Sequence, residues 1–216
     1  MNSIKRFLII PVMLISLSVS AQMFGESSKQ VYKANNYKDI LSTHQNVAIL
    51  PFKATISYKR VPKNFNAEAN TADEKKLGLS MQEGMFTYLL RKSDKYSVQF
   101  QDIQRTNALL KQKGIFDNLD EILPDSLCKI LNVDAVIKCT YGYEKTGSEA
   151  GAIVSAVLIG NGKTGSGGLT MQINDKKQGE LVWRFYKEMN ESITSNANEI
   201  MDRMMRKVSR NFPYEK

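Results

Sequence analysis

A short apolar run closed by a proline does most to limit the folds open to this chain. Val47-Ala-Ile-Leu50 contains no polar residue, which is typical of a buried strand, and Pro51 ends it because proline cannot donate a ladder hydrogen bond. Strand and helix patterns alternate along the rest of the chain. The expected elements are a strand at 46–52, a helix at 71–92, a strand at 96–100, helices at 102–114 and 119–131, a strand at 133–143, a hairpin of strands at 169–173 and 181–185, and a helix at 192–210. This order predicts a single α/β domain over residues 46–216, with a mixed sheet of about five strands flanked by helices.

Local signals indicate where the helices begin and end. Thr71 and Glu74 form a capping box that is expected to start the first helix. Asp102 is the expected N-cap of the second helix, and Gly114 supplies a left-handed residue after its end. Pro124 is expected to begin the main part of the third helix, because proline is tolerated at the first helical position.

Three segments carry weaker patterns. Residues 22–45 are polar with scattered apolar positions, and they predict an N-terminal arm that contains a short helix. Residues 54–70 predict a long, mobile connection. Residues 148–168 are rich in small side chains, and they predict a short, closely packed helix followed by a flexible glycine loop. A membrane-inserting hairpin is not expected there, because residues 152–159 do not alternate in polarity.

The first 21 residues have the three parts of a cleavable secretory signal peptide. Lys5 and Arg6 give a positive start, residues 7–19 are mostly apolar, and Val19-Ser20-Ala21 places small side chains before cleavage at Gln22. The apolar part would span about 20 Å as a helix, too short for the hydrocarbon core of about 30 Å. No cysteine directly follows it for acylation. We therefore expect an exported protein without a transmembrane span, in the periplasm or at the periplasmic face of the outer membrane.

The chain is basic, with 30 Lys and Arg against 22 Asp and Glu, a formal net charge of +8. Removal of residues 1–21 takes away two basic residues, which leaves 28 − 22 = +6. Such a surplus suits nucleic acid, anionic lipid or an acidic polymer. The charges are dispersed, however, and an exported protein rarely meets nucleic acid. We expect lysines on a solvated surface and no nucleic-acid partner.

Signatures of metal binding and nucleophilic catalysis are missing from the sequence. His44 is the one histidine, and its polar neighbours indicate an exposed loop residue rather than a ligand. There is no C-x-x-C pair and no G-x-S-x-G motif. Gly162-Lys163-Thr164 resembles part of a phosphate-binding loop, but Val157 stands where that loop needs a glycine. We expect no catalytic, cofactor-binding or metal-binding residues, and hence no enzyme.

Two groups of residues leave alternatives open. Trp183 and Tyr186 form either a binding platform or part of the core, and alternate residues of a hairpin are usually core. Four carboxylates stand at expected helix caps or strand starts, where structural roles suffice, although a spatially paired acid and base is not visible in a sequence: Asp73, Asp102, Asp125 and Asp134.

Cys128 and Cys139 are expected to stay free thiols, although the exported compartment permits disulfides. Cys128 lies about 5 Å before the end of its helix, and Cys139 about 20 Å along the strand that follows. Because the strand folds back against the helix, about 15 Å would separate the two along their common direction. A disulfide needs Cα atoms within about 7 Å, so both are expected to be small buried apolar residues.

Several phrases along the chain resemble a group of bacterial envelope proteins. They are Val47-Ala-Ile-Leu-Pro-Phe52, Val98-Gln-Phe-Gln-Asp-Ile-Gln-Arg-Thr-Asn107, Leu131-Asn-Val-Asp-Ala-Val-Ile137 and Asn174-Asp-Lys-Lys-Gln-Gly-Glu-Leu-Val-Trp183. The group contains the curli secretion lipoprotein, the amino-terminal domain of the Tol-Pal translocation protein and the lipoprotein activators of penicillin-binding proteins. The resemblance spans residues 46–210, and the phrasing is most similar to exported proteins of Bacteroidetes-type bacteria. It implies a small α/β fold similar to an anticodon-binding domain.

The resemblance also implies a non-enzymatic role in binding, assembly or scaffolding, with envelope proteins or further copies of the chain as partners. A channel role is not expected, because the chain lacks the curli-type lipid anchor and long membrane-spanning hairpins. No site residue is carried over, since the matching phrases form the fold. The alternative hypothesis is a periplasmic protein that binds a small ligand or polymer in an enclosed pocket. An interaction module should instead expose an apolar patch or a self-complementary face.

Overall fold

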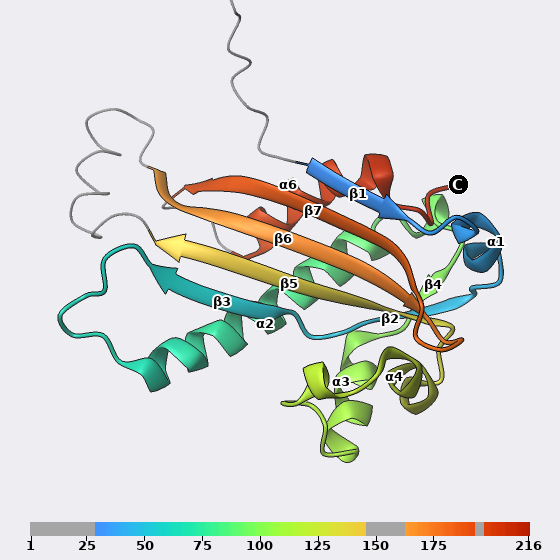
Figure 1. Ribbon diagram of the computed structural model, residues 1–216, viewed down its shortest axis with the longest axis horizontal. Helices are drawn as coiled ribbons and strands as arrows, with labels where there is room; N and C mark the ends of the chain where they lie inside the picture. The colour runs from blue at the N-terminus through green and yellow to red at the C-terminus, as the bar shows by residue number, and fades with distance from the viewer. Residues whose placement is uncertain (1–28, 146–162, 193–196) are drawn as a thin grey trace, which may run out of the picture.

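A seven-stranded mixed sheet forms the frame of the protein in this computed structural model, which describes residues 29–145, 163–192 and 197–216 (Figure 1). The strands are β1 (Lys29–Lys33), β2 (Asn46–Ile49), β3 (Lys53–Tyr58), β4 (Gln99–Phe100), β5 (Ala135–Lys145), β6 (Lys163–Asp175) and β7 (Leu181–Ser192). Their order is β1-β7-β6-β5-β2-β4, and β3 also pairs with β5. β2 and β3 run parallel to β5. In the series β1-β7-β6-β5, each strand is antiparallel to the next. The predicted α/β class with a mixed sheet is confirmed, with more strands than expected.

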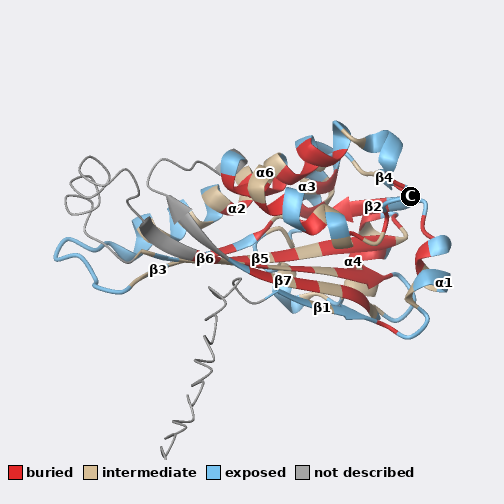
Figure 2. Cartoon of the chain, turned by 90° about the horizontal axis from the view of Figure 1, so that it is seen from above, coloured by how far each residue is buried: buried red, intermediate tan, exposed pale blue. Residues whose placement is uncertain are grey.

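The helices cover the two faces of the sheet unequally. They are α1 (Tyr37–Ser42), α2 (Ala67–Leu90), α3 (Ile103–Gln112), α4 (Pro124–Leu131) and α6 (Ala197–Val208), with 3-10 turns at Ser93–Lys95, Leu119–Glu121 and Ser209–Asn211. α2 and α6 pack on one face and form the main core with β2, β5, β6 and β7 (Figure 2). α3 and α4 cover the other face around β2 and the start of β5. β2 serves both cores, because Val47 and Ile49 face the main core while Ala48 and Leu50 face the second.

Residues 53–58 form β3 rather than part of a mobile connection. Each residue from Lys53 to Tyr58 pairs in parallel with one from Thr140 to Lys145. The side chains alternate, with Ala54 buried and Ile56 and Tyr58 half-buried between exposed neighbours. The expectation was wrong because this alternation follows Pro51, which ends β2 but does not end the pairing with β5.

Helix α2 begins at Ala67, one turn before the predicted capping box. Asn66 is the N-cap, and its side-chain oxygen accepts a hydrogen bond from the Ala69 N–H at 2.8 Å. Thr71 lies inside the helix. Glu74 accepts a hydrogen bond from the Ile56 N–H of β3 instead of capping the helix. The capping box fails because Asn66 offers the same chemistry earlier, and Glu74 is needed by the strand.

Other helix ends follow the sequence signals. The Asp102 side chain accepts a hydrogen bond from the Arg105 N–H at 3.0 Å and caps α3. Gly114 follows α3 with φ of +68°, and Pro124 is the first residue of α4. The helix expected at 192–210 is present as α6, but it begins at Ala197, because Ser192 is the last residue of β7. The strand expected at 96–100 is shortened to β4. Within the expected N-terminal arm, α1 is the short helix, whereas β1 is an edge strand that the sequence did not indicate.

The hairpin is confirmed as β6 and β7, and both strands are longer than expected. The expected glycine loop is wrong for residues 163–168, which belong to β6. A Cβ on Gly167 would lie 2.5 Å from the Tyr141 hydroxyl oxygen, and one on Gly168 would lie 3.6 Å from the Tyr186 ring. Glycines fit here because aromatic side chains of the neighbouring strands lie across them. The expected signal peptide and the helix expected from residue 148 lie outside the described residues.

Both cysteines are free and buried, as predicted. Cys139 belongs to the main core and Cys128 to the second core, so the sheet separates them. Among the described residues, no helix combines the length and apolar character needed to cross a membrane.

Candidate functional site

The join between β2 and β3 is irregular, because both strands pair with the same edge of β5. Ile49 lies opposite Ile137 and Lys53 lies opposite Thr140, so four residue steps (49 to 53) face three (137 to 140). One extra residue is therefore accommodated around Pro51, which is the defining feature of a β-bulge. Proline suits this position because it has no N–H to leave unpaired.

Helix α2 is shaped to fit this bulge. A Cβ on Gly78 would clash with the carbonyl oxygen of Phe52, so only glycine allows the helix to approach so closely. The buried Gln82 side chain donates to the Ile49 carbonyl oxygen at 2.8 Å, and it exchanges hydrogen bonds with Asn107 of α3. The backbone beside the bulge is thus satisfied by side chains of the helices.

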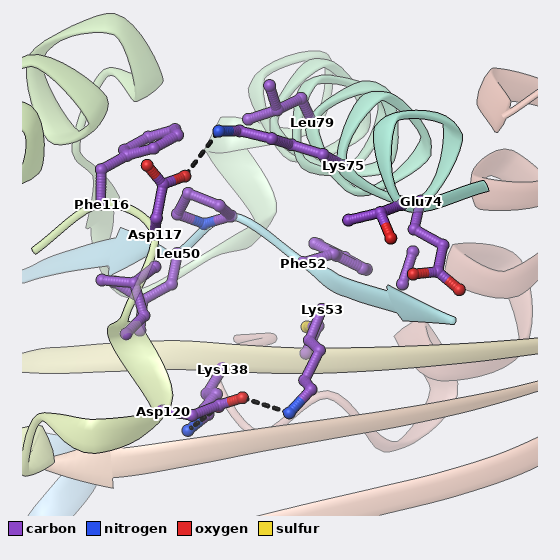
Figure 3. A pocket seen from close by; sticks show the side chains of 15 residues that line it. Leu50, Phe52, Lys53, Glu74, Lys75, Leu79, Phe116, Asp117, Asp120 and Lys138 are labelled. Atoms are coloured by element: carbon purple, nitrogen blue, oxygen red, sulfur yellow. Dashed lines mark hydrogen bonds and ion pairs between the residues drawn. The ribbon is translucent and has the colours of Figure 1, made fainter. Parts of the chain in front are cut away.

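A groove of about 460 Å³ lies beside the bulge, between α2, β3 and the segment before the turn Leu119–Glu121 (Figure 3). Its apolar lining comes from these elements together: Leu50, Phe52, Leu79, Phe116 and Leu119. Its charged lining consists of three basic and three acidic side chains: Lys53, Lys75, Lys138, Glu74, Asp117 and Asp120. The groove is therefore apolar inside and charged around its rim.

Every charged side chain of this groove has a partner within the protein. Asp120 lies between two lysines, with its carboxylate oxygens 2.5 Å from Lys53 Nζ and 2.6 Å from Lys138 Nζ (Figure 3). Hydrogen bonds from Lys138 and Lys53 lower the pKa of Asp120 below its usual value. Lys75 pairs with Asp117 at 2.5 Å, and Glu74 is held by the Ile56 N–H. The rim carries no net formal charge.

The groove has few side chains that could take part in proton transfer or nucleophilic attack without first leaving an ion pair. Its lining residues, all in the described part of the chain, include no histidine. Cys139 is the one thiol at the groove, and burial raises the pKa of this thiol well above its usual value, which keeps it protonated and unreactive. An apolar floor inside a polar rim resembles the general anatomy of protein–protein interfaces, in which the core is apolar and the rim is polar.

His44 lies elsewhere and is buried, so the prediction of an exposed loop residue was wrong. Its Nε2 is 2.7 Å from Asp175 Oδ1, and its Nδ1 is 2.7 Å from the Tyr214 hydroxyl oxygen. Burial raises the pKa of Tyr214 well above its usual value, so its hydroxyl stays protonated. The three buried side chains join the segment after α1, the end of β6 and the C-terminal tail.

The four carboxylates singled out in the sequence do not come together. Asp102 caps α3, Asp125 pairs with Lys129 at 3.2 Å, and Asp73 is exposed on α2. Within residues 29–145, 163–192 and 197–216, no group of three His, Cys, Asp or Glu side chains could hold a metal ion.

Asp134 fastens the starts of β2 and β5. Its Oδ2 accepts hydrogen bonds from the N–H groups of Gln45 and Asn46 at 2.9 and 3.0 Å, and its Oδ1 lies 2.5 Å from Lys176 Nζ. Burial acts to raise the pKa of Asp134, but these hydrogen bonds outweigh it and lower the pKa to about 2.

Trp183 and Tyr186 do not form one platform. Trp183 is fully buried in the main core, whereas Tyr186 is half-buried and donates a hydrogen bond to Glu188 at 2.8 Å. The sequence reasoning also missed the residues of the groove. The one available signal was the alternation from Lys53 to Tyr58, which would have placed Lys53 on a strand beside Pro51.

No protein-family model matches the chain, and no curated protein matches it. Solved structures that are similar in part include three bacterial proteins. Lipoprotein GNA1162 from Neisseria meningitidis has a TM-score of 0.45 at 13% identity, over 78% of this chain and 97% of that one. The PelC dodecamer from Paraburkholderia phytofirmans has a TM-score of 0.43 at 13% identity, over 88% of this chain and 99% of that one. The LpoB C-terminal domain from Salmonella enterica has a TM-score of 0.33 at 10% identity, over 69% of this chain and 85% of that one. Values this low assign no family and no function to this chain.

Proposed function

We propose that the protein is a non-enzymatic interaction or assembly protein of the cell envelope. In this proposal the signal peptide at residues 1–21 directs export, and the mature chain acts in the periplasm or at the periplasmic face of the outer membrane. The observation that supports an interaction role is the groove beside Pro51, where the floor is apolar and all charged groups are already paired.

The occupant that fits this groove is a segment of another envelope protein with an apolar side chain. A charged substrate would have to break the ion pairs of Asp120 and Asp117. With Glu74, the three lysines and three carboxylates of the rim sum to zero, so the rim offers no net charge to attract it. An apolar side chain can instead contact Phe52, Leu79 and Phe116 while the paired charges surround it. The alternative is a small ligand or polymer, since about 460 Å³ also lies within the range of ligand pockets.

Site-specific photo-crosslinking in the native envelope tests the proposal. A photoreactive residue in place of Thr71, which is exposed at the groove, should crosslink to one protein band. The same residue in place of Lys113, exposed at the end of α3, is the control and should not give that band. Leu79→Arg, which places a charge in the apolar floor, should abolish the crosslink at position 71 without unfolding the chain.

Two results would overturn this function. Equal crosslinking from positions 71 and 113 would show that the groove does not select a partner. A bound small molecule that is seen by native mass spectrometry and lost in Leu79→Arg would favour the ligand-binding alternative. Export and cleavage of the signal peptide are tested separately. The intact mass of the protein isolated from the envelope should correspond to a chain that begins at Gln22.

A further inference from the structure

A second hollow, of about 510 Å³, lies between the α1 region and the C-terminal tail. Figure 1 shows α1 and the C-terminus close to each other. One wall comes from β1 and α1, and the other comes from the tail that follows α6. Tyr37, Leu41 and Phe212 contribute to its apolar lining. Its charged side chains are four cations and one carboxylate: Lys33, Lys38, Arg210, Lys216 and Glu215.

The four cations differ from the lysines of the groove beside Pro51 because no carboxylate pairs with them. None takes part in an ion pair of the described residues. Lys33 Nζ lies 5.2 Å from the centre of the Tyr37 ring, and Lys216 Nζ donates to the Asp94 carbonyl oxygen at 3.1 Å. These contacts orient the two ammonium groups without neutralising them.

The C-terminal tail, which carries Arg210 and Lys216, is fixed to the rest of the domain by hydrogen bonds. The Ser97 N–H donates to the Tyr214 carbonyl oxygen, and the Lys216 N–H donates to the Lys95 carbonyl oxygen, both at 2.9 Å. The buried Tyr214 hydroxyl is anchored on His44. The tail that carries Arg210 and Lys216 is therefore well anchored.

We propose that this hollow binds phosphate groups, as a site separate from the groove beside Pro51. Four unpaired cations around one hollow repel each other, and an anion with several charges relieves that repulsion. Arg210 offers planar paired donors that match phosphate oxygens, and the lysines add point charges around them. The phosphate belongs either to a soluble compound or to a lipid headgroup.

Two binding measurements with the purified mature chain, from Gln22 onward, distinguish these sources. Pyrophosphate is titrated into labelled protein and followed by NMR shifts, and vesicles of phosphatidylglycerol or phosphatidylcholine are tested by co-sedimentation. Pyrophosphate binding supports a soluble source. Binding to phosphatidylglycerol vesicles alone supports a headgroup. Either should weaken as NaCl is raised. No binding of either probe overturns the proposal.

The variants locate the site. Lys38→Gln with Arg210→Gln removes two exposed cations that form no ion pair among the described residues, and it should weaken binding about tenfold. Lys76→Gln with Lys113→Gln removes the same charge from exposed positions on α2 and after α3, and binding should be unchanged. Equal loss in both double variants would show attraction by net charge alone and would overturn the assigned site. Equal melting temperatures check that each variant is folded.

Discussion

His44 holds together three segments that are far apart in the sequence. Its ring nitrogens contact Asp175 and Tyr214, and all three side chains are buried. His44→Ala would leave a carboxylate and a hydroxyl buried without this partner. We expect the free energy of unfolding to fall by about 3 kcal/mol, measured by urea denaturation. Gln45→Ala, at the exposed neighbouring position, should change it by less than about 0.5 kcal/mol. A similar loss in both variants would contradict the anchoring role of His44.

Asp134 should make folding stability depend on acid pH. Its pKa is lowered from 3.8 to about 2 in the folded protein, so the ionised form is favoured by folding. The resulting stabilisation, about 2 kcal/mol, is complete above pH 4 and is lost as the pH falls towards 2. Asp134→Asn should therefore be less stable at pH 7 by up to about this amount, and the difference should shrink between pH 4 and pH 2.

Chemical denaturation at pH 7, 4, 3 and 2 measures this difference. Asp73→Asn, at an exposed position of α2, is the matched control and should follow the pH profile of the unchanged protein. A constant gap between Asp134→Asn and the unchanged protein across the series would show that the hydrogen bonds of Asp134 do not set its ionisation.

Residue roles that depend on distant partners are the ones that the sequence could not show. His44 has polar neighbours, which indicate exposure, but its contacts lie 131 and 170 residues away. Asp102 and Pro124, in contrast, act on their own helices and were assigned correctly. The charged residues of the groove could not be predicted for the same reason. Asp120 contacts Lys53 and Lys138 only because β3 pairs with β5.

Gly78 determines how closely α2 approaches the bulge between β2 and β3. In an open helix, glycine to alanine stabilises by up to about 1 kcal/mol. Here the added methyl would clash with the Phe52 carbonyl oxygen, which is backbone and cannot turn aside. Gly78→Ala should therefore destabilise the protein by about 2 kcal/mol in urea denaturation. Gly142→Ala is the control, because its methyl would meet nothing within 4 Å. An increase in stability on Gly78→Ala would contradict this close contact.

The edges of the sheet are protected against strand addition by other copies of the chain. On β3, Glu74 accepts from the Ile56 N–H and Asn70 Nδ2 donates to the Ile56 carbonyl oxygen. Directly before β4, the tail pairs with the chain through the bridge between Tyr96 and Glu215. β1 is short, exposed and bounded by lysines at both ends. Any self-association is therefore expected to use side-chain surfaces such as the groove rather than an extended sheet.

Elements with strong periodicity were predicted well, and elements defined by their partners were not. The apolar stripe of α6 and the alternation of the hairpin indicate burial without knowledge of the fold. β1 contains mostly polar residues and is a strand because β7 offers it hydrogen bonds. β6 extends through glycines that no strand propensity favours, since Tyr141 and Tyr186 cover them.

The stability of the whole domain is expected to depend on α6. This helix follows the last strand in the chain and covers the main core. Ile200, Met201, Met204 and Val208 are buried in that core together with α2 and the sheet. A charge at position 200 would be buried without a partner, and the favourable burial of the isoleucine, about 1.5–3 kcal/mol, would also be lost. Ile200→Asp should therefore leave the chain unfolded or lower its melting temperature by more than 10 °C, on the order expected for this loss.

Circular dichroism during heating measures this transition. Lys207→Asp places the same residue at an exposed position of the same helix, so it controls for the helix propensity of aspartate. It lowers the net charge by two units, against one in Ile200→Asp, and it should still melt close to the unchanged protein. If Ile200→Asp melted like this control, α6 would not be part of the folding unit. Its apolar stripe would then be a surface for a partner. An apolar helix face that is not buried in its own domain is exposed to water, and such faces are commonly buried against another molecule.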